Sequence, residues 1–444
     1  MSNDVWEMIP FTSAVDVMSD EGKRLKQRDY LEQGKIPVID QGEAFIGGYT
    51  NDDGMSYKGE LPVIIFGDHT RRIKLVNHPF AVGADGVKIL KPKPFYRPKF
   101  FFFFLQSLEI PSRGYSRHFQ FLRSFEFVKT TPKEQDRVVA KIEKQFSRLD
   151  EAVASLKRIQ ANIKRYKASV LKAAVEGKLT EQWRKDHPNV EPADQLLKSI
   201  LTERRAKWEA EELAKMKAKG TKPKDDSWKK KYNEPAGPDT ANLPELPVGW
   251  VWASIEQLAG HIVDGTHHTP TYVEDGIDFI SAKDIDGWKI DFSRCRKIPQ
   301  EEHTELIKRC YPQTGHVLIS KSGTIGRVAI VKTDKPFSLF ESVAVIPLLK
   351  FMSSEFIAYA VFSGVQGEFG KKWQKGVAVR HLHLEDLRRL PIQLPPLKEQ
   401  EKVVQAFEQQ NTIAENVEKT IGAELVRSER LRQTILKKTF SNDC

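Results

Sequence analysis

The chain has 444 residues, 40% of them hydrophobic and 29% charged, a composition typical of folded proteins rather than disordered ones. Its 70 Lys and Arg residues exceed its 60 Asp and Glu residues, and the net charge of +10 favours polyanionic partners over acidic small molecules. The cysteines Cys295, Cys310 and Cys444 form no CxxC pair, and the longest purely apolar run, 100–105, is too short to span a membrane. These features exclude a disulfide framework, a zinc ribbon and a membrane protein. Because the first residues also lack a signal-peptide pattern, we expect a cytoplasmic protein.

Residues 1–130 have the pattern of a mixed α/β domain. Short β-rich runs at 35–40, 61–67 and 86–90 alternate with Gly, Asp and Pro turns and predict strands. The phenylalanine-rich run at 100–108 predicts a buried helix that packs on the resulting sheet. We therefore expect its phenylalanines to belong to the core.

A long helix is predicted next, over residues 132–176, because no Gly or Pro interrupts 134–176. Apolar residues recur every seven positions along it, a spacing typical of a coiled coil; they are Ile142, Leu149, Leu156, Ile163 and Val170. A charged helix over 191–219 and a Pro- and Lys-rich surface linker over 220–246 follow. The basic excess within 200–231 fits either a solvated helix face or a basic patch that contacts nucleic acid or a partner.

A second domain is predicted over residues 247–394, with strands at 278–282, 316–320, 327–331 and 343–349 and a helix at 353–363. Residues 395–444 then form a second long helix, whose apolar seam is weaker than that of the first. A helix with a weak seam needs a partner, and the first long helix is the obvious candidate.

An internal repeat relates the two long helices. The run KEQDRVV at 133–139 aligns with KEQEKVV at 398–404, at an offset of 265 residues. The offset still holds at the other end of the helices, where 170–172 aligns with 435–437 without a gap. The chain is therefore organised as domain, long helix, connector, domain and long helix.

No catalytic motif accompanies this organisation. The chain lacks GxxxxGK[ST], [DN]PP[FY] and GxGxxG, and KSGTIGR at 321–327 is better explained as a turn between strands. The pairs His267–His268 and His381/His383 lack a third metal ligand, so we expect them to be solvated or hydrogen-bonded. These absences predict a protein that is not an enzyme.

Taken together, these segments resemble the specificity (S) subunits of bacterial type I restriction-modification systems. The resemblance rests on LPPLKEQEKVV and its counterpart TTPKEQDRVV, on YKASVLKAAVEGKLTEQWR, on LPVGWVWASIEQLA and on GHVLISKSGTIGRVAIV. The first copy departs from the pattern at Thr131, where the second has Pro396. Each motif is modest alone, but their order and spacing are specific.

The resemblance implies an α+β fold with two mixed α/β target recognition domains, separated by two long helices that form an antiparallel coiled coil, with an internal pseudo-twofold repeat. The implied boundaries are 1–130 and 247–394 for the domains, and 131–246 and 395–444 for the helical regions. Each domain would read one half of a bipartite, asymmetric site on double-stranded DNA, and the helices would set the half-site spacing.

The same resemblance implies partners. Two modification subunits would dock on the helices and carry S-adenosylmethionine and adenine-N6 methylation, and restriction subunits would bring the ATP- and Mg-dependent motor and nuclease. This chain would bind no cofactor or metal and catalyse no reaction. The alternative from the residues alone is a coiled-coil scaffold or adaptor that does not read DNA.

Base reading is expected in polar turns, because arginine pairs with guanine edges and Lys, Ser and Thr contact phosphates or base edges. The candidate DNA-binding residues of the first domain are Asp68, His69, Thr70, Arg71, Arg72, Arg113, Tyr115, Arg117 and His118. Those of the second are Ser281, Lys283, Asp284, Lys321, Ser322, Thr324, Arg327, Lys375, Arg380 and His381. Apolar helix residues that two helices cannot cover are candidates for binding partner subunits; they are Val138, Val139, Val403, Val404, Phe407 and Ile435.

Overall fold

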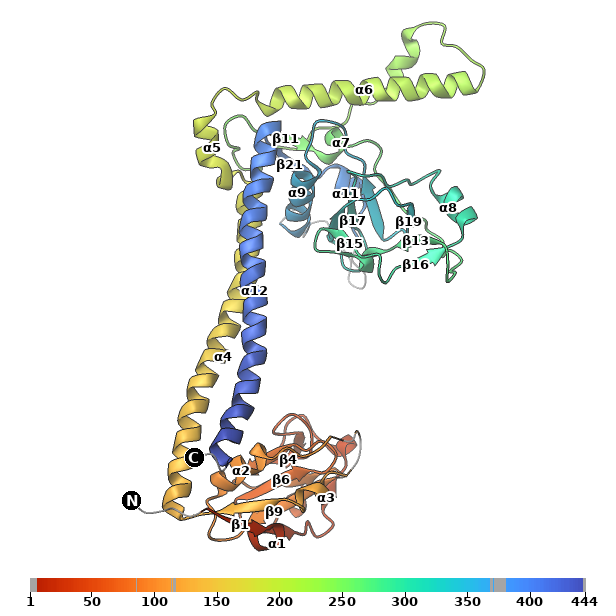
Figure 1. Cartoon of the computed structure of the whole chain (residues 1–444). Coiled ribbons are helices and arrows are strands. Elements are labelled where there is room, and N and C mark those ends of the chain that lie inside the picture. The colour runs from red at the N-terminus through yellow and green to blue at the C-terminus, as the bar shows by residue number, and fades with distance from the viewer. Residues whose placement is uncertain are drawn as a thin grey trace. The chain divides into compact units, whose positions relative to one another are not determined.

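The structure, a computed structural model, describes residues 6–84, 86–112, 114, 117–367, 370 and 381–441 (Figure 1). The chain divides into two compact units, one of residues 1–161 and 418–444 and the other of residues 162–417. Each unit holds one α+β domain and one end of each long helix. Within the described ranges, no helix combines the length and the apolar character needed to cross a bilayer. The domain boundaries inferred from the sequence stay predictions.

The domain of the first unit contains two four-stranded sheets and a two-stranded ribbon. The first sheet is antiparallel, in the order β2 (Val15–Met18), β9 (Val87–Pro92), β6 (Val63–Gly67), β7 (Ile73–Val76). The second has the order β3 (Arg24–Leu25), β8 (Ala81–Gly83), β4 (Ile36–Ile39), β5 (Gly48–Thr50), with β8 parallel to both neighbours. The ribbon pairs β1 (Glu7–Pro10) with β10 (Glu126–Lys129), so strands from both ends of the domain meet just before the long helix.

Strand β6 is buried along its whole length because both of its faces are covered. Side chains alternate between the faces of a strand, so Ile64 and Phe66 join the core that contains helix α2 (Pro98–Ser107). Val63 and Ile65 join a second core that includes residues of the other sheet. Of the five phenylalanines of α2, all but the partly buried Phe102 are at most 8% exposed, which confirms the predicted core helix.

The second domain repeats most of this topology, but its second sheet has three strands. Its antiparallel sheet has the order β12 (Val263–Asp264), β20 (Val343–Ile346), β17 (Val317–Ser320), β18 (Val328–Ile330). Its second sheet has the order β16 (Arg296–Ile298), β13 (Ile277–Ile280), β19 (Phe337–Leu339), with β13 parallel to β19 and antiparallel to β16. The ribbon pairs β11 (Val251–Ser254) with β21 (Pro391–Leu394), and helix α9 (Ser354–Gln366) takes the role of α2. The sequence analysis found the main strands but missed both ribbons.

Short elements complete the two domains. A small hairpin in the second domain joins β14 (Ile285–Asp286) to β15 (Lys289–Ile290). The short helices are α1 (Phe11–Ala14), α3 (Phe119–Leu122), α5 (Glu181–Asp186), α7 (Ile255–Leu258), α8 (Gln300–Leu306) and α11 (Leu384–Arg388). The 3-10 helices are η1 (Gln27–Asp29), η2 (Asp53–Met55), η3 (Lys178–Thr180), η4 (Asp226–Lys231) and η5 (Ala282–Asp284).

The two long helices, α4 (Pro132–Val175) and α12 (Leu397–Phe440), have 44 residues each. Their first residues are 265 positions apart, and so are their last residues, which confirms the gapless repeat. In the first unit, the guanidinium of Arg432 in α12 lies 4.3 Å from the ring centre of Phe146 in α4. In the second unit, Tyr166 Oη of α4 donates to Gln410 Oε1 of α12 at 2.7 Å. The start of α4 therefore lies beside the end of α12, and its end beside the start of α12, so the helices pair antiparallel (Figure 1).

A buried glutamine locks each long helix to its domain. Gln135 Oε1 accepts a hydrogen bond from Arg97 N, 2.7 Å, and its Nε2 donates to Thr130 O, 2.9 Å. Gln400 Oε1 likewise accepts from Ser353 N, 2.9 Å, and its Nε2 donates to the carbonyl oxygen of residue 395, 3.1 Å. Arg97 and Ser353 are the N-cap residues of α2 and α9, so one amide joins the domain helix to the start of the long helix in both copies. This contact explains why the glutamine of the run KEQ occurs in both copies.

The connector contains helix α6 (Ala193–Ala218), close to the predicted range. The segment predicted to be a flexible linker contains the 3-10 helix η4, in which Trp228 is 8% exposed and packs on α6. A Pro- and Lys-rich composition indicated a chain without contacts, whereas this aromatic side chain anchors the segment.

Candidate nucleic-acid interface

Three loops of the first domain come together at one end of its sheets. They are the turn between β6 and β7 (68–72), the loop after β4 (40–47) and the segment after α2, of which residues 109–112, 114, 117 and 118 are described. His69 N donates to Gln41 Oε1, 3.1 Å, and Thr70 Oγ1 donates to Gln41 O, 2.7 Å. His118 N donates to Asp68 O, 2.8 Å, so the third segment is bonded to the same turn. His118 of the second predicted cluster therefore neighbours the first cluster, and Gln41 is a member that the sequence analysis missed.

The second domain brings the corresponding loops together. The turn between β17 and β18 (321–327) meets the loop after β13 through Arg327, which donates to Ile285 O at 3.1 Å. It meets the segment after α9 through Leu382 N, which donates to Lys321 O at 2.8 Å. This last bond corresponds to that between His118 and Asp68 in the first domain. Both domains thus present the same arrangement of three loops with different side chains.

Three of the predicted DNA-binding side chains are buried and hold these loops in shape. Asp68 accepts a hydrogen bond from Phe119 N at 2.8 Å, and the ring Nδ1 of His118 lies 2.9 Å from Asp68 O. Asp284 accepts from Ser281 N, 2.8 Å, and from Ser281 Oγ, 2.7 Å. Asp68, His118 and Asp284 are 5%, 1% and 3% exposed, so direct DNA contact by these side chains is at odds with the structure. Sequence alone could not separate them from exposed turn residues.

Other predicted residues are accessible. Those that are exposed are Thr70, Arg71, Arg72, Arg117, Lys283, Thr324 and His381. Those of intermediate burial are His69, Ser281, Lys321, Ser322 and Arg327. The remaining predicted residues, Arg113, Tyr115, Lys375 and Arg380, lie outside the described residues. DNA contact by the accessible residues stays a prediction.

The arginines of the first hairpin are anchored to its neighbours. Arg71 donates to Ile110 O at 2.8 Å and has a φ of 59°, in the left-handed region. Arg72 forms an exposed ion pair with Glu43, with NH2 and Oε1 3.1 Å apart. An exposed pair of this kind is weak and can be exchanged for a phosphate or a base edge.

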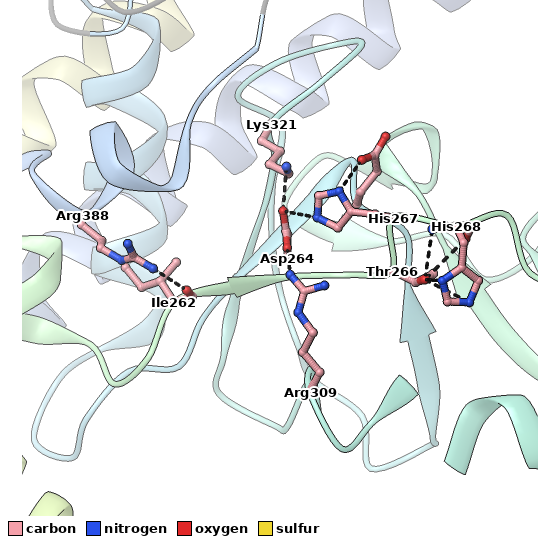
Figure 2. Close-up of polar contacts among 9 residues, drawn as sticks. Ile262, Asp264, Thr266, His267, His268, Arg309, Lys321 and Arg388 are labelled. Atoms are coloured by element: carbon pink, nitrogen blue, oxygen red, sulfur yellow. Dashed lines mark hydrogen bonds and ion pairs between the residues drawn. The ribbon is translucent and has the colours of Figure 1, made fainter. Parts of the chain in front are cut away.

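The second domain contains a charged cluster around Asp264, at the end of β12 (Figure 2). Its carboxylate lies 2.7 Å from Lys321 Nζ, 2.6 Å from Arg309 NH2 and 3.2 Å from His267 Nε2. His267 Nδ1 is in turn 2.9 Å from a carboxylate oxygen of Glu341. Burial raises the pKa of Asp264, but the hydrogen bonds and charges of Lys321 and His267 outweigh it and lower the pKa below its usual value. Lys321 therefore holds the turn to the sheet, a role that the sequence analysis did not anticipate.

The histidine pair beside this cluster is hydrogen-bonded, as expected. Figure 2 shows Thr266 Oγ1 beside the ring of His268, with Oγ1 and Nδ1 2.8 Å apart. Over the ranges that the structure describes, no three His, Cys, Asp or Glu side chains gather as metal ligands. The arrangement can offer charged and hydrogen-bonding groups to a ligand.

The predicted partner-binding residues are mostly part of the cores. Val138, Val403 and Phe407 are at most 5% exposed, which is at odds with a role as a docking surface. Val139, Val404 and Ile435 are partly buried beside them. The exposed apolar residues of the two helices lie elsewhere, each 41–51% exposed; they are Ile159, Tyr166, Ile413, Val417, Val426 and Leu431. They do not follow the heptad seam, so the seam pattern did not reveal them.

These observations define a class of protein made of two copies of one α+β domain, each followed by a long helix that pairs with its counterpart. Residues 208–426 match the family of the type I restriction modification DNA specificity domain. This half of the chain therefore carries the DNA specificity domain of that family.

Curated relatives support this assignment. The chain is 26% identical over 311 residues to the specificity subunit of the type I restriction enzyme EcoBI from Escherichia coli, a match that covers 70% of this chain and 56% of that subunit. It is 22% identical to the EcoDI specificity subunit of Escherichia coli, over 70% of this chain and 61% of that subunit. The matches therefore span less than two thirds of these relatives.

Solved structures share the fold over nearly the whole chain. A chain from work on complex assembly and conformational transition of a type I R-M system matches with a TM-score of 0.60 at 15% identity, covering 99% of this chain and 98% of that one. The HsdS subunit of Thermoanaerobacter tengcongensis matches with a TM-score of 0.51 at 14% identity, covering 99% and 97%. These matches confirm the predicted architecture.

Proposed function

We propose that this chain gives a type I restriction-modification complex its DNA sequence specificity, and that each domain reads one half of a bipartite, asymmetric site on double-stranded DNA. The observation that carries the proposal is the repeated three-loop arrangement. One backbone hydrogen bond between these loops, from His118 to Asp68 and from Leu382 to Lys321, recurs in both domains. The exposed side chains differ: Arg71 and Arg72 in one domain, Lys283 and Thr324 in the other. Two equal scaffolds with unequal contact residues suit a site whose halves differ in sequence.

The paired helices α4 and α12 set the spacing between the half-sites and dock two modification subunits. The exposed apolar residues on these helices support docking. Tyr166 and Ile413 are 42% and 51% exposed, and apolar side chains that gather on a surface mark sites where another protein binds. Since the helices are related by the repeat, two like subunits have related places to bind.

Catalysis and cofactors belong to the partners in this proposal. S-adenosylmethionine and adenine-N6 methylation are assigned to the modification subunits, and ATP and Mg to the restriction subunits. This chain binds none of these cofactors, carries out no catalysis and acts in the cytoplasm, where the DNA lies. Sequence reading, half-site spacing and the docking of modification subunits are then the contributions of this non-catalytic subunit.

Selection from a duplex library tests the proposal. The complex of this chain with modification subunits is incubated with a fully randomised duplex pool, and the bound fraction is sequenced. We expect two short enriched blocks separated by an unspecified spacer of fixed length. Modification subunits alone are the control and should enrich nothing.

A bound pool without any enriched block would contradict the proposal and favour the alternative, a coiled-coil scaffold or adaptor that does not read DNA. The salt dependence of DNA affinity then further distinguishes a DNA-reading subunit from a protein scaffold. Phosphate contacts make DNA affinity fall steeply as salt rises, whereas assembly on a protein scaffold need not depend on DNA at all.

A further inference from the structure

The charged connector is folded against the second domain rather than loose. The first turns of α6 bury Leu196 and Ile200 in the core of that domain, and Arg204 Nε donates to Ala259 O at 3.3 Å. The helix then continues to Ala218, where the chain turns and returns along it as η4.

An aromatic cluster fixes this return. The rings of Trp208 and Trp228 stack with centres 5.9 Å apart, and Tyr232 lies 5.3 Å from Trp208. Arg204 NH1 donates to Tyr232 Oη at 3.0 Å, which ties the end of the return to the well-packed part of α6. A turn held in this way presents its side chains without the full cost of ordering a loop.

Positive charge is concentrated on this turn. Residues 215–231 contain eight lysines and two aspartates, a net charge of +6. Lys215 and Lys229 are neutralised by Glu212 at 2.7 Å and Asp226 at 3.1 Å. The other six lysines, which we name the lysine tip, are all exposed; they are Lys217, Lys219, Lys222, Lys224, Lys230 and Lys231. Across the residues that the structure describes, no acidic side chain forms an ion pair with any of them.

The composition of the turn favours phosphates over a protein surface. Protein interfaces have an apolar, often aromatic centre and are depleted of lysine. Between residues 205 and 231, all described, the exposed large apolar side chain is Leu213 alone, and Trp228 is buried. Lysine binds phosphate as a point charge and needs no shaped pocket, which suits contacts that do not depend on sequence.

We propose that the lysine tip is a second DNA contact, which binds backbone phosphates independently of sequence and adds affinity to whatever site the two domains select. This inference rests on the proposed function, since it assumes that the chain works on DNA. It adds an element outside the two recognition domains and assigns the connector a role.

The test measures DNA affinity of the complex of this chain with modification subunits, from about 50 to 300 mM salt. One duplex carries the selected site, and an equally long duplex has both half-sites scrambled. The test variant changes all six tip lysines to Gln, a second variant changes them to Arg, and the matched control is Lys215→Gln with Lys229→Gln, whose lysines already have acidic partners.

Each phosphate contact adds about 0.9 to the slope of log affinity against log salt. We expect the six Lys→Gln changes to reduce the slope by about two or more on both duplexes, to leave the preference for the selected site unchanged, and to be rescued by Arg. The control should change the slope by less than the test variant does.

A smaller reduction than two overturns the inference, as does an equal reduction in the control. Loss of modification subunits from the Lys→Gln complex at an unchanged slope also overturns it, because the tip then binds protein. If the wild-type complex shows no site preference, the proposed function fails, and the scrambled duplex still decides whether the tip binds phosphates.

Discussion

The corner where each long helix leaves its domain can be compared residue by residue in the two copies. Gln135 and Gln400 make equivalent hydrogen bonds in their own units. The preceding glutamates differ. Glu399 is 1% exposed and accepts from Thr180 Oγ1, 2.7 Å, and Trp250 Nε1, 2.9 Å.

The glutamate of the other copy has simpler surroundings. Glu134 forms an ion pair at 2.5 Å with Arg137, one turn along its own helix and 73% exposed. Glu399 pairs instead with Arg184, which is 18% exposed and also donates to Gly177 O at 2.9 Å. The two copies therefore keep the same contacts where a side chain must bond to buried backbone groups, and differ where side chains contact only other side chains.

The largest expected effect is a difference between the two glutamates. Glu399→Ala removes the carboxylate that pairs with the half-buried Arg184 and leaves the buried Trp250 Nε1 without its acceptor, and we expect a loss of about 3–5 kcal/mol in the stability of the second unit. Glu134→Ala removes a pair with an exposed arginine, and we expect a loss of less than about 1.5 kcal/mol. Native-state hydrogen exchange measures each unit separately, and equal losses in the two variants would refute the comparison.

The two glutamines should behave alike. Gln135→Leu and Gln400→Leu each leave a backbone N–H and carbonyl oxygen without a partner, and we expect about 2–3 kcal/mol from each. Gln409→Leu, at an exposed position of the same helix, is the control and should cost less than about 0.5 kcal/mol. The free energy of unfolding of the three variants is compared by chemical denaturation, with hydrogen exchange as the readout for each unit. A large effect in one copy alone would mean that the repeat is not a structural equivalence.

These corners also show what could be predicted from the sequence. The absence of Gly and Pro and the heptad seam predicted the first long helix to within a residue, because local spacing determines helices. The second long helix was predicted over 395–444, and α12 spans Leu397–Phe440. The acceptor role of Gln400 was not predictable, since Ser353 is 47 positions away and the contact exists only in the folded domain. The burial of turn residues was equally unpredictable. Asp68 and Arg72 are both charged residues of the same predicted turn, but Asp68 is buried and Arg72 is exposed.

A second difference between the two domains concerns the pH dependence of stability. Burial, with Lys207 nearby, lowers the pKa of His316 from its usual value to about 4, and its Nδ1 accepts from Gln313 N at 3.2 Å. The folded state therefore favours the neutral ring, while the unfolded chain takes up a proton below about pH 6.5, so stability falls as pH drops from about 6.5 to 4. We expect His316→Gln to flatten this part of the thermal unfolding profile of the second unit. His316 directly precedes β17, whereas Pro62, which directly precedes the counterpart strand β6, has no titratable side chain. The same pH dependence in the variant would contradict the assignment.

The smallest expected effect on stability is at the reading loops. Arg72→Ala removes an exposed ion pair with Glu43, and we expect less than about 0.5 kcal/mol. Lys35→Ala, whose exposed pair with Asp53 lies at the other end of β4, is the matched control and should cost as little. Denaturant unfolding compares the two, and a loss above about 1 kcal/mol at Arg72 would make it a scaffold residue.

The central claim is that the two domains share one fold but expose different DNA-contacting side chains, and that each domain reads one half of the site. Duplex selection with the complex carrying Arg71→Ala and Arg72→Ala, beside a complex carrying Lys283→Ala and Thr324→Ala, tests it most directly. The account predicts that each variant relaxes or changes one enriched block, a different one in each case, and leaves the spacer and the other block as in the wild type. Changes in both blocks from either pair, or unchanged blocks at unchanged affinity from both pairs, would contradict it.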